Sequence, residues 1–180
     1  MVAITDKLLP AGNKNRPGTP ISPKKIIIHR TGNPGASALA NRSYWIHDPN
    51  WHSAHYIVDS QGIFRCIPEN EKAYHCAGAN GDGIGIEICE LPGPSVNPVT
   101  YRNVLNLIVE ILLRRKWQPT DEFIQPHSKY DNVNRRFDPF NWLDYKAGKH
   151  NPGKELFDQF VFYADLKTHF RAAGGKLWQS

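Results

Sequence analysis

The sequence predicts one α/β domain, in which a central mixed β-sheet is flanked by helices. Short β-branched runs such as Ile26-Ile27-Ile28 alternate along the chain with segments of helical periodicity. No internal repeat is visible, and no linker leads to a second domain, so residues 1–180 are expected to fold as one unit. The 180 residues, 40% of them hydrophobic, suit a single sizeable core.

The first elements follow a lead-in that we expect to wrap on the domain surface, residues 1–24, which is rich in Pro, Gly and Asn. Residues 25–29 are predicted to form a buried strand because β-branched side chains pack well on a pleated surface. Residues 37–47 are predicted to form a short helix with Ser37 as its N-cap. The expected inward-facing residues of this helix are Leu39, Tyr44 and Trp45.

The middle of the chain predicts three strands. Residues 53–59 and 63–67 are separated by the turn Ser60-Gln61-Gly62 and are expected to form a β-hairpin. Residues 84–90 follow a glycine-rich loop and form the next predicted strand. Its apolar side chains alternate, which places Ile84, Ile86 and Ile88 on one face.

The last predicted elements are two helices and a short strand. Residues 101–117 carry an apolar stripe at helical spacing and end before Pro119. Residues 123–124 form a short strand that leads to His127, and residues 154–172 form a final helix. The expected apolar stripe consists of Val104, Leu105, Ile108, Ile111, Leu112 and Leu113.

Composition and charge exclude several classes of protein. No apolar run approaches the roughly 20 residues of a membrane span, and no signal-peptide pattern is visible, so synthesis in the cytoplasm is expected. The cysteines lack CxxC spacing and are expected to be buried free thiols: Cys66, Cys76 and Cys89. The net charge of +5 favours polyanionic partners. Because the only basic run, Arg114-Arg115-Lys116, is expected to be solvated at a helix end, no nucleic-acid partner is predicted.

Two histidines share an unusual setting. His29 and His127 each follow a short strand and each begin a polar loop, and Asp138 lies eleven residues after His127. Two neutral imidazoles and a carboxylate make a suitable three-residue set for zinc, which leaves a fourth position for water in catalytic sites. Two loop histidines and an aspartate that starts a turn explain the same pattern equally well.

Glu87 lies on a predicted core strand and points away from its isoleucines. A carboxylate there is costly unless it is paired, hydrogen-bonded or faces a cleft. If Glu87 faces the same cleft as His29, it could accept a proton from an activated water; otherwise the outer face of the strand is solvated. Glu90, at the end of the strand, is expected to be solvated.

Five segments carry a family resemblance, in order, between residues 26 and 139. They are Ile26-Ile27-Ile28-His29-Arg30-Thr31, Ser53-Ala54-His55-Tyr56-Ile57-Val58-Asp59, Ala73-Tyr74-His75-Cys76-Ala77-Gly78, Ile84-Gly85-Ile86-Glu87-Ile88-Cys89, and Pro126-His127 with Asp138-Pro139. Together they resemble zinc-dependent N-acetylmuramoyl-L-alanine amidases of the type-2 family. This family includes phage endolysins and bacterial autolysins and is related to peptidoglycan recognition proteins, so the resemblance implies a fold of that type.

The resemblance implies that one zinc ion per chain is bound by His29, His127 and Asp138, and that Glu87 is the catalytic carboxylate. The family usually has a lysine two residues before the third ligand, proposed to stabilise the oxyanion. Here that residue is Arg136, which keeps the charge but cannot act as an acid. Because alternate residues share a face in an extended segment, Arg136 is preferred to Arg135 for this role.

Further residues are expected near the substrate. His75 is expected to hydrogen-bond the substrate or the developing oxyanion, whereas His55 is expected either to contact substrate or to support the core. Trp45, Trp51 and Tyr74 are candidates for stacking on sugar or peptide, although aromatic residues of this kind also serve as core or rim.

The expected function is therefore hydrolysis of the amide between N-acetylmuramic acid and L-alanine in peptidoglycan, by a cell-wall-lysing enzyme released from the cytoplasm. A monomer is expected. Two alternatives remain open: a non-catalytic peptidoglycan-binding module, and a zinc peptidase that cuts within the stem peptide, because the same metal chemistry serves it.

Overall fold

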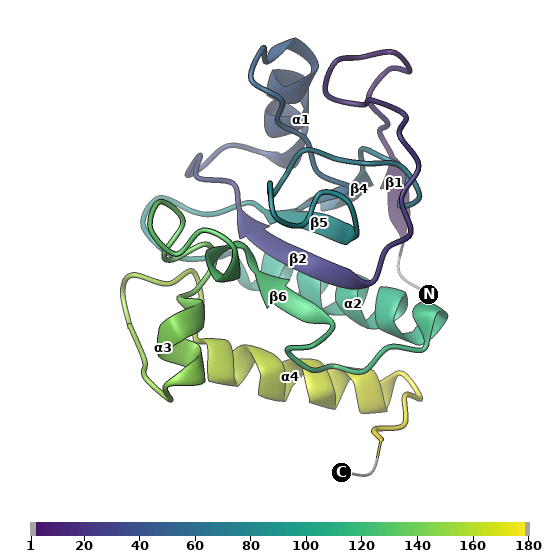
Figure 1. Cartoon of the computed structure of the whole chain (residues 1–180). Coiled ribbons are helices and arrows are strands. Elements are labelled where there is room, and N and C mark those ends of the chain that lie inside the picture. The colour runs from purple at the N-terminus through teal and green to yellow at the C-terminus, as the bar shows by residue number, and fades with distance from the viewer. Residues whose placement is uncertain (1–2, 179–180) are drawn as a thin grey trace.

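The computed structural model describes residues 3–178 and has three layers, with one sheet between helices (Figure 1). Its strands are β1 (Ile4–Asp6), β2 (Lys25–Arg30), β3 (Tyr56–Asp59), β4 (Gly62–Arg65), β5 (Gly83–Ile88) and β6 (Ile124–Pro126). Its helices are α1 (Ala38–His47), α2 (Pro98–Arg115), the 3-10 turn η1 (His127–Lys129), α3 (Trp142–Lys146) and α4 (Gln159–Ala172). The predicted α/β class is confirmed.

The six-stranded sheet has the order β1-β4-β3-β5-β2-β6. Only β3 and β4 pair antiparallel, as the expected hairpin, and the other neighbouring strands are parallel. The sheet is therefore mixed, as predicted. Its central pair, β2 and β5, aligns His29 with Glu87, so two candidate site residues lie side by side on adjacent strands.

The two faces of the sheet have different roles. Ile26 and Ile28 of β2, together with the isoleucines of β5, pack against α2 and α4 in the main core. The opposite face is covered in part by α1, where Trp45 packs with Ile57 of β3. Figure 1 shows α1 on one side of the sheet and α2 with α4 on the other. Because side chains alternate along a strand, His29 and Glu87 point toward the α1 side, away from the main core.

Several boundaries differ from those predicted. The expected surface lead-in contains β1, which pairs parallel with β4 at the sheet edge. The hairpin's first strand begins at Tyr56 rather than at Ser53, whose amide bonds to the Tyr74 carbonyl in a loop. α4 begins at Gln159, where the Asp158 side chain caps two amides. α3, which has no long apolar stripe, was not predicted.

Two of the three inward residues expected for α1 are wrong. Leu39 and Tyr44 are 45% and 55% exposed, whereas Trp45 is buried as predicted. Because α1 is short and its end borders a cleft, Ala38 and Asn41 provide the rest of its buried side. The Ser37 cap is confirmed, since its side chain accepts a hydrogen bond from the Ala40 amide.

The three cysteines are buried free thiols, as predicted. Among the helices formed by residues 3–178, none has the length and apolar character needed to cross a bilayer.

Glu69, in the loop after β4, is bonded to the C-terminal end of α2. Its carboxylate accepts hydrogen bonds from Arg114, Arg115 and the Tyr56 hydroxyl, so the basic run expected to be solvated is ion-paired here. Burial raises the pKa of Glu69, but these hydrogen bonds lower it more, and the net shift is downward.

Glu69→Gln is expected to lower the free energy of unfolding by about 2 kcal/mol at neutral pH, because it removes charge-assisted hydrogen bonds. The folded pKa is below the ordinary value of 4.5, so this contribution is complete above pH 4.5 and disappears as the pH falls below it. Urea unfolding at several pH values measures the difference. Glu110→Gln, which removes only the exposed pair with Arg114, is the control and should cost less than about 0.5 kcal/mol.

Candidate functional site

The candidate site lies where three parallel strands end. His29 is near the end of β2, Glu87 is near the end of β5, and His127 begins η1 immediately after β6. Both β5 and β6 pair parallel with β2, so their carboxyl ends meet at the same edge of the sheet. The strand order therefore brings His29 and His127 together, although they lie 98 residues apart in the sequence.

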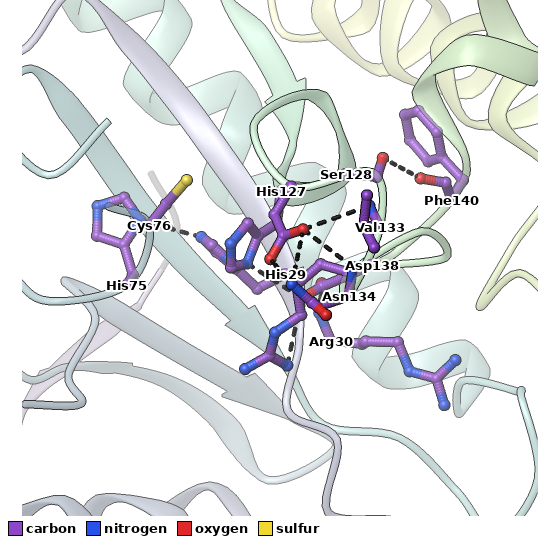
Figure 2. Close-up of polar contacts among 12 residues, drawn as sticks. His29, Arg30, His75, Cys76, His127, Ser128, Val133, Asn134, Asp138 and Phe140 are labelled. Atoms are coloured by element: carbon purple, nitrogen blue, oxygen red, sulfur yellow. Dashed lines mark hydrogen bonds and ion pairs between the residues drawn. The ribbon is translucent and has the colours of Figure 1, made fainter. Parts of the chain in front are cut away.

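Two histidines and one aspartate converge at this edge, as Figure 2 shows. The Nδ1 atoms of His29 and His127 lie 3.0 Å apart, and Nδ1 of His127 lies 3.2 Å from Oδ2 of Asp138. One candidate ligand atom from each of the three residues lies within 4.8 Å of the others. The second Asp138 oxygen, Oδ1, accepts a 2.6 Å hydrogen bond from the Arg30 amide, which orients the carboxylate. Two imidazole nitrogens and an oriented carboxylate are a donor set that suits zinc.

The free side of the His29 ring is held by a second histidine. Nε2 of His29 lies 3.0 Å from Nδ1 of His75, and Nε2 of His75 lies 3.2 Å from the Gly83 carbonyl oxygen. A carbonyl only accepts, so His75 carries its proton on Nε2 and accepts at Nδ1 from His29. Nδ1 of His29 is then free of a proton, which is the form that binds a metal.

His55 lies deeper and has no exposed surface. Its Nδ1 accepts a hydrogen bond from the Gly85 amide, and its Nε2 donates to the Glu71 carbonyl. Burial lowers the pKa of His55 to about 4, which keeps the ring neutral in this position. Both ring nitrogens are therefore bonded to the main chain, beneath the ring of His75.

Gly85 leaves the space that the His75 ring occupies. A Cβ atom at Gly85 would lie 2.5 Å from Cγ of His75, closer than such atoms approach in proteins. The absence of a side chain on this central strand is thus what allows His75 to lie against the sheet and reach His29.

Gly85→Ala is expected to displace His75, to lower the free energy of unfolding by about 1–3 kcal/mol and to weaken zinc binding about 10- to 100-fold. Thermal unfolding and zinc competition with a chelator measure the two effects. Gly81→Ala is the matched control, since a Cβ atom there meets nothing within 4 Å. Unchanged zinc affinity in Gly85→Ala would contradict the support that His75 gives to His29.

Burial and neighbouring charges shift the pKa values of the site. Burial lowers the pKa of His29 well below its ordinary value, and the nearby His75 adds to this. Burial also lowers the pKa of His127, but the interactions of its ring with Asp138 and with Cys76 together outweigh burial and raise the pKa to about 9. The pKa of Glu87 is raised well above its ordinary value by burial and by the negative charge of Asp138.

A cleft of about 300 Å³ opens above these groups. Its polar wall contains Glu87, whose Oε2 has no hydrogen-bond partner among residues 3–178. Of the residues expected to contact substrate, His75, Trp45 and Tyr74 line the cleft, whereas His55 does not. Tyr44, which sequence reasoning assigned to the core, also lines it.

Trp51, a further candidate for contact with substrate, does not line the cleft but packs against Tyr74, which does. The exposed Trp51 packs edge-on against Tyr74, with ring centroids 5.2 Å apart, and Nζ of Lys14 lies 4.6 Å from the centre of its ring. Trp51 has a φ of 63°, a conformation rarely adopted by residues other than glycine. The sequence offers no sign of this backbone conformation.

Arg135 and Arg136 point to different places. Nη1 of Arg135 lies 3.8 Å from Oδ2 of Asp138, and Arg135 lines the cleft. Arg136 lies over Phe137 and approaches Asp144 at 3.7 Å. An extended segment was expected here, but the chain turns instead. The Asp138 amide donates a hydrogen bond to the Arg135 carbonyl. In a turn, residues three apart share a side, so Arg135 comes next to Asp138.

Glu90 corrects a further expectation. It is buried rather than solvated, and its carboxylate lies 2.5 Å from Nη2 of Arg30. The residue after His29 therefore has two roles, since its amide holds Asp138 and its guanidinium pairs with a buried carboxylate. Neither role has a signal in the sequence pattern, because both partners are distant along the chain.

Comparisons with known proteins give one family match and several similar sequences and structures. Residues 17–141 match the family described as N-acetylmuramoyl-L-alanine amidase (Amidase_2). The chain is similar to N-acetylmuramoyl-L-alanine amidase XlyA of Bacillus subtilis (strain 168), with 40% identity over 96 residues, covering 50% of this chain and 32% of that protein. It is also similar to CwlH of the same organism, with 38% identity over 137 residues, covering 72% of this chain and 54% of the relative. The chain thus spans about a third to a half of these relatives.

Solved structures share the fold. The catalytic domain of XlyA superposes with a TM-score of 0.69 at 26% identity, covering 92% of this chain and 99% of that one. PlyL superposes with a TM-score of 0.71 at 20% identity, covering 92% and 97%, and supports the fold alone.

Proposed function

The chain belongs to the family of type-2 N-acetylmuramoyl-L-alanine amidases, and from this we propose that it hydrolyses the amide between N-acetylmuramic acid and L-alanine in peptidoglycan. The observation that carries the proposal is one cleft that contains His127, Asp138 and Glu87 beside His29. A binding module without catalysis would need no carboxylate kept unpaired next to a metal-binding group.

Zinc fits the residues present. The Nδ1 atoms of His29 and His127 face each other, and Nδ1 of His127 also faces Asp138. The outer sides of His29 and Asp138 are held by His75 and by the Arg30 amide. Such outer hydrogen bonds orient metal ligands in proteins. When bound there by His29, His127 and Asp138, zinc supplies Lewis acidity toward the scissile carbonyl and lowers the pKa of water.

Glu87 is proposed as the general base and then the general acid. Its carboxylate faces the cleft, and burial with the Asp138 charge raises its pKa, which increases its affinity for a proton. A carboxylate of this kind can accept a proton from the attacking water and deliver it to the nitrogen of L-alanine as the amide breaks. Its place on β5, next to β2, keeps it within the same site as His29.

Arg135 is proposed to stabilise the negative charge that develops on the carbonyl oxygen. The resemblance implied Arg136, but Arg135 lines the cleft and lies closer to Asp138. Its guanidinium stays protonated, so it acts through charge and hydrogen bonding.

Arg135→Gln is expected to lower kcat about 10²- to 10³-fold with a much smaller change in KM, because the lost interaction strengthens in the transition state. Arg135→Lys should recover part of the loss by restoring the charge. Kinetics on purified walls measure both variants. A larger fall in kcat for Arg136→Gln than for Arg135→Gln would return the role to Arg136.

The remaining cleft residues are proposed to hold the substrate. Trp45 and Tyr74 offer ring surface to a sugar or a peptide, and His75 contributes chiefly by holding His29. His55 is proposed to support His75 from below. We further propose that the enzyme acts as a monomer on the wall after its release from the cell.

Product analysis on purified cell walls tests the function. The amidase produces new N-terminal L-alanine and leaves the muramic acid without its peptide. A peptidase that cuts within the stem peptide would instead produce new termini inside the peptide, and a binding module would produce none. Either of the last two results, obtained with zinc-loaded protein, would contradict the proposal.

A further inference from the structure

A second hollow, of about 320 Å³, adjoins the cleft. It lies along the turn-rich segment after η1 and shares Arg30, Gly32, Arg135 and Asp138 with the cleft wall. A ligand that reaches the metal-binding group can therefore extend into this hollow without leaving the surface. Apart from the shared Arg135 and Asp138, the residues of this hollow have no part in the proposed mechanism.

The hollow contains arginine side chains that lack hydrogen bonds. Within residues 3–178, Arg135 and Arg136 approach carboxylates only at 3.8 and 3.7 Å, beyond hydrogen-bond distance. By contrast, Arg16 and Arg65 each donate two hydrogen bonds to a carboxylate. Arg30, on the shared wall, is already paired with Glu90.

Arg136 is the cation of this hollow with most freedom to bind a ligand. Its side chain is 56% exposed. Asp144, its nearest carboxylate, already accepts hydrogen bonds from Asn141 and Asn151 through the oxygen that faces Arg136. A guanidinium presents a planar pair of donors that matches a carboxylate, and such bidentate pairs are strong where the carboxylate is not already bonded.

We propose that the hollow is a subsite for a carboxylate on the peptide side of the scissile bond, held by Arg136. This assignment rests on the proposed amidase function. In the protein, Arg136 precedes the proposed zinc ligand Asp138 by two residues, and two residues span at most about 7 Å. In an extended peptide substrate, the second residue lies at a similar distance from the scissile carbonyl. A carboxylate on that second residue could therefore reach Arg136 while the carbonyl lies at the metal-binding group. The free α-carboxylate of D-glutamate at the second position of a stem peptide meets this requirement.

Two substrates that differ in one group test the assignment: muramoyl-L-Ala-D-Glu, with the free α-carboxylate, and muramoyl-L-Ala-D-isoglutamine, with a carboxamide there. Arg136→Gln is expected to lower kcat/KM about tenfold for the acid, mainly through KM, and at most about twofold for the amide. The unsubstituted enzyme is expected to prefer the acid over the amide, and this preference should disappear in Arg136→Gln. Arg136→Lys should keep part of it, since it retains the charge without the planar donors.

Arg102→Gln is the matched control, because it removes the same charge from the exposed side of α2, on the opposite face of the sheet. It should leave the preference intact. Equal losses on both substrates in Arg136→Gln, or no loss on either, would overturn the subsite, and an equal fall in kcat would assign Arg136 to the reacting carbonyl instead. Failure of the unsubstituted, zinc-loaded enzyme on both substrates would overturn the amidase function, and the subsite with it.

Discussion

Replacing Glu87 by Gln is expected to lower kcat on purified cell walls about 10³-fold while the chain folds and keeps its zinc. Gln has the same shape but cannot accept and return a proton, so the general acid–base contribution is lost. The ligand residues keep their partners, because Glu87 makes no hydrogen bond to His29, His127 or Asp138. Metal analysis together with kinetics checks both parts of the result.

The same variant should be more stable than the parent when metal is removed. The raised pKa of Glu87 means that folding disfavours its charged form, so an ionised Glu87 destabilises the protein at neutral pH. Its neutral replacement removes that cost, and the melting temperature should rise by about 2–4 °C for each kcal/mol gained. Near-normal wall lysis, or a loss of zinc, would contradict the assignment of Glu87.

His127→Ala is expected to abolish zinc binding and reduce wall lysis to background. The remaining pair, His29 and Asp138, offers too few ligands for a stable zinc site, which in proteins usually has three or more. In the parent, zinc at about 1,000 times its Kd stabilises the folded state by about 4 kcal/mol, or about 10 °C in melting temperature. The variant should lose this zinc-dependent increase.

His47→Ala provides the matched control, since His47 is exposed at the end of α1. It should retain zinc and the thermal shift. One zinc ion per chain in purified His127→Ala, measured by elemental analysis, would exclude His127 as a ligand.

The buried strands were the most predictable part of the fold. The run Ile26-Ile27-Ile28 and the alternation of Ile84, Ile86 and Ile88 define β2 and β5, because burial on a pleated sheet depends on local pattern. β1 was not predicted, since three residues at a sheet edge gain their order from pairing with β4 rather than from their own pattern. The helix α1 was predicted, but two of its residues were assigned to the wrong side, because the surrounding loops decide which side faces the cleft.

The candidate site was predictable where chemistry and strand ends coincide. His29, His127 and Glu87 each stand at or near the end of a strand, and the order of the strands brings them together. Which arginine lines the cleft was not predictable, because the positions of Arg135 and Arg136 depend on whether the segment turns. That turn is formed by main-chain hydrogen bonds between residues of an irregular loop, which side-chain patterns do not encode.

The site is assembled from two kinds of support. His29 and Glu87 belong to the central strands, whereas His127 and Asp138 belong to η1 and the turns that follow it. A bound ion would therefore connect the irregular segment after β6 to the two central strands of the sheet. If zinc binds there as proposed, its removal would let the segment around residues 127–138 open locally while the sheet stays folded. Metal supply would then set the protease resistance of this loop separately from the stability of the domain.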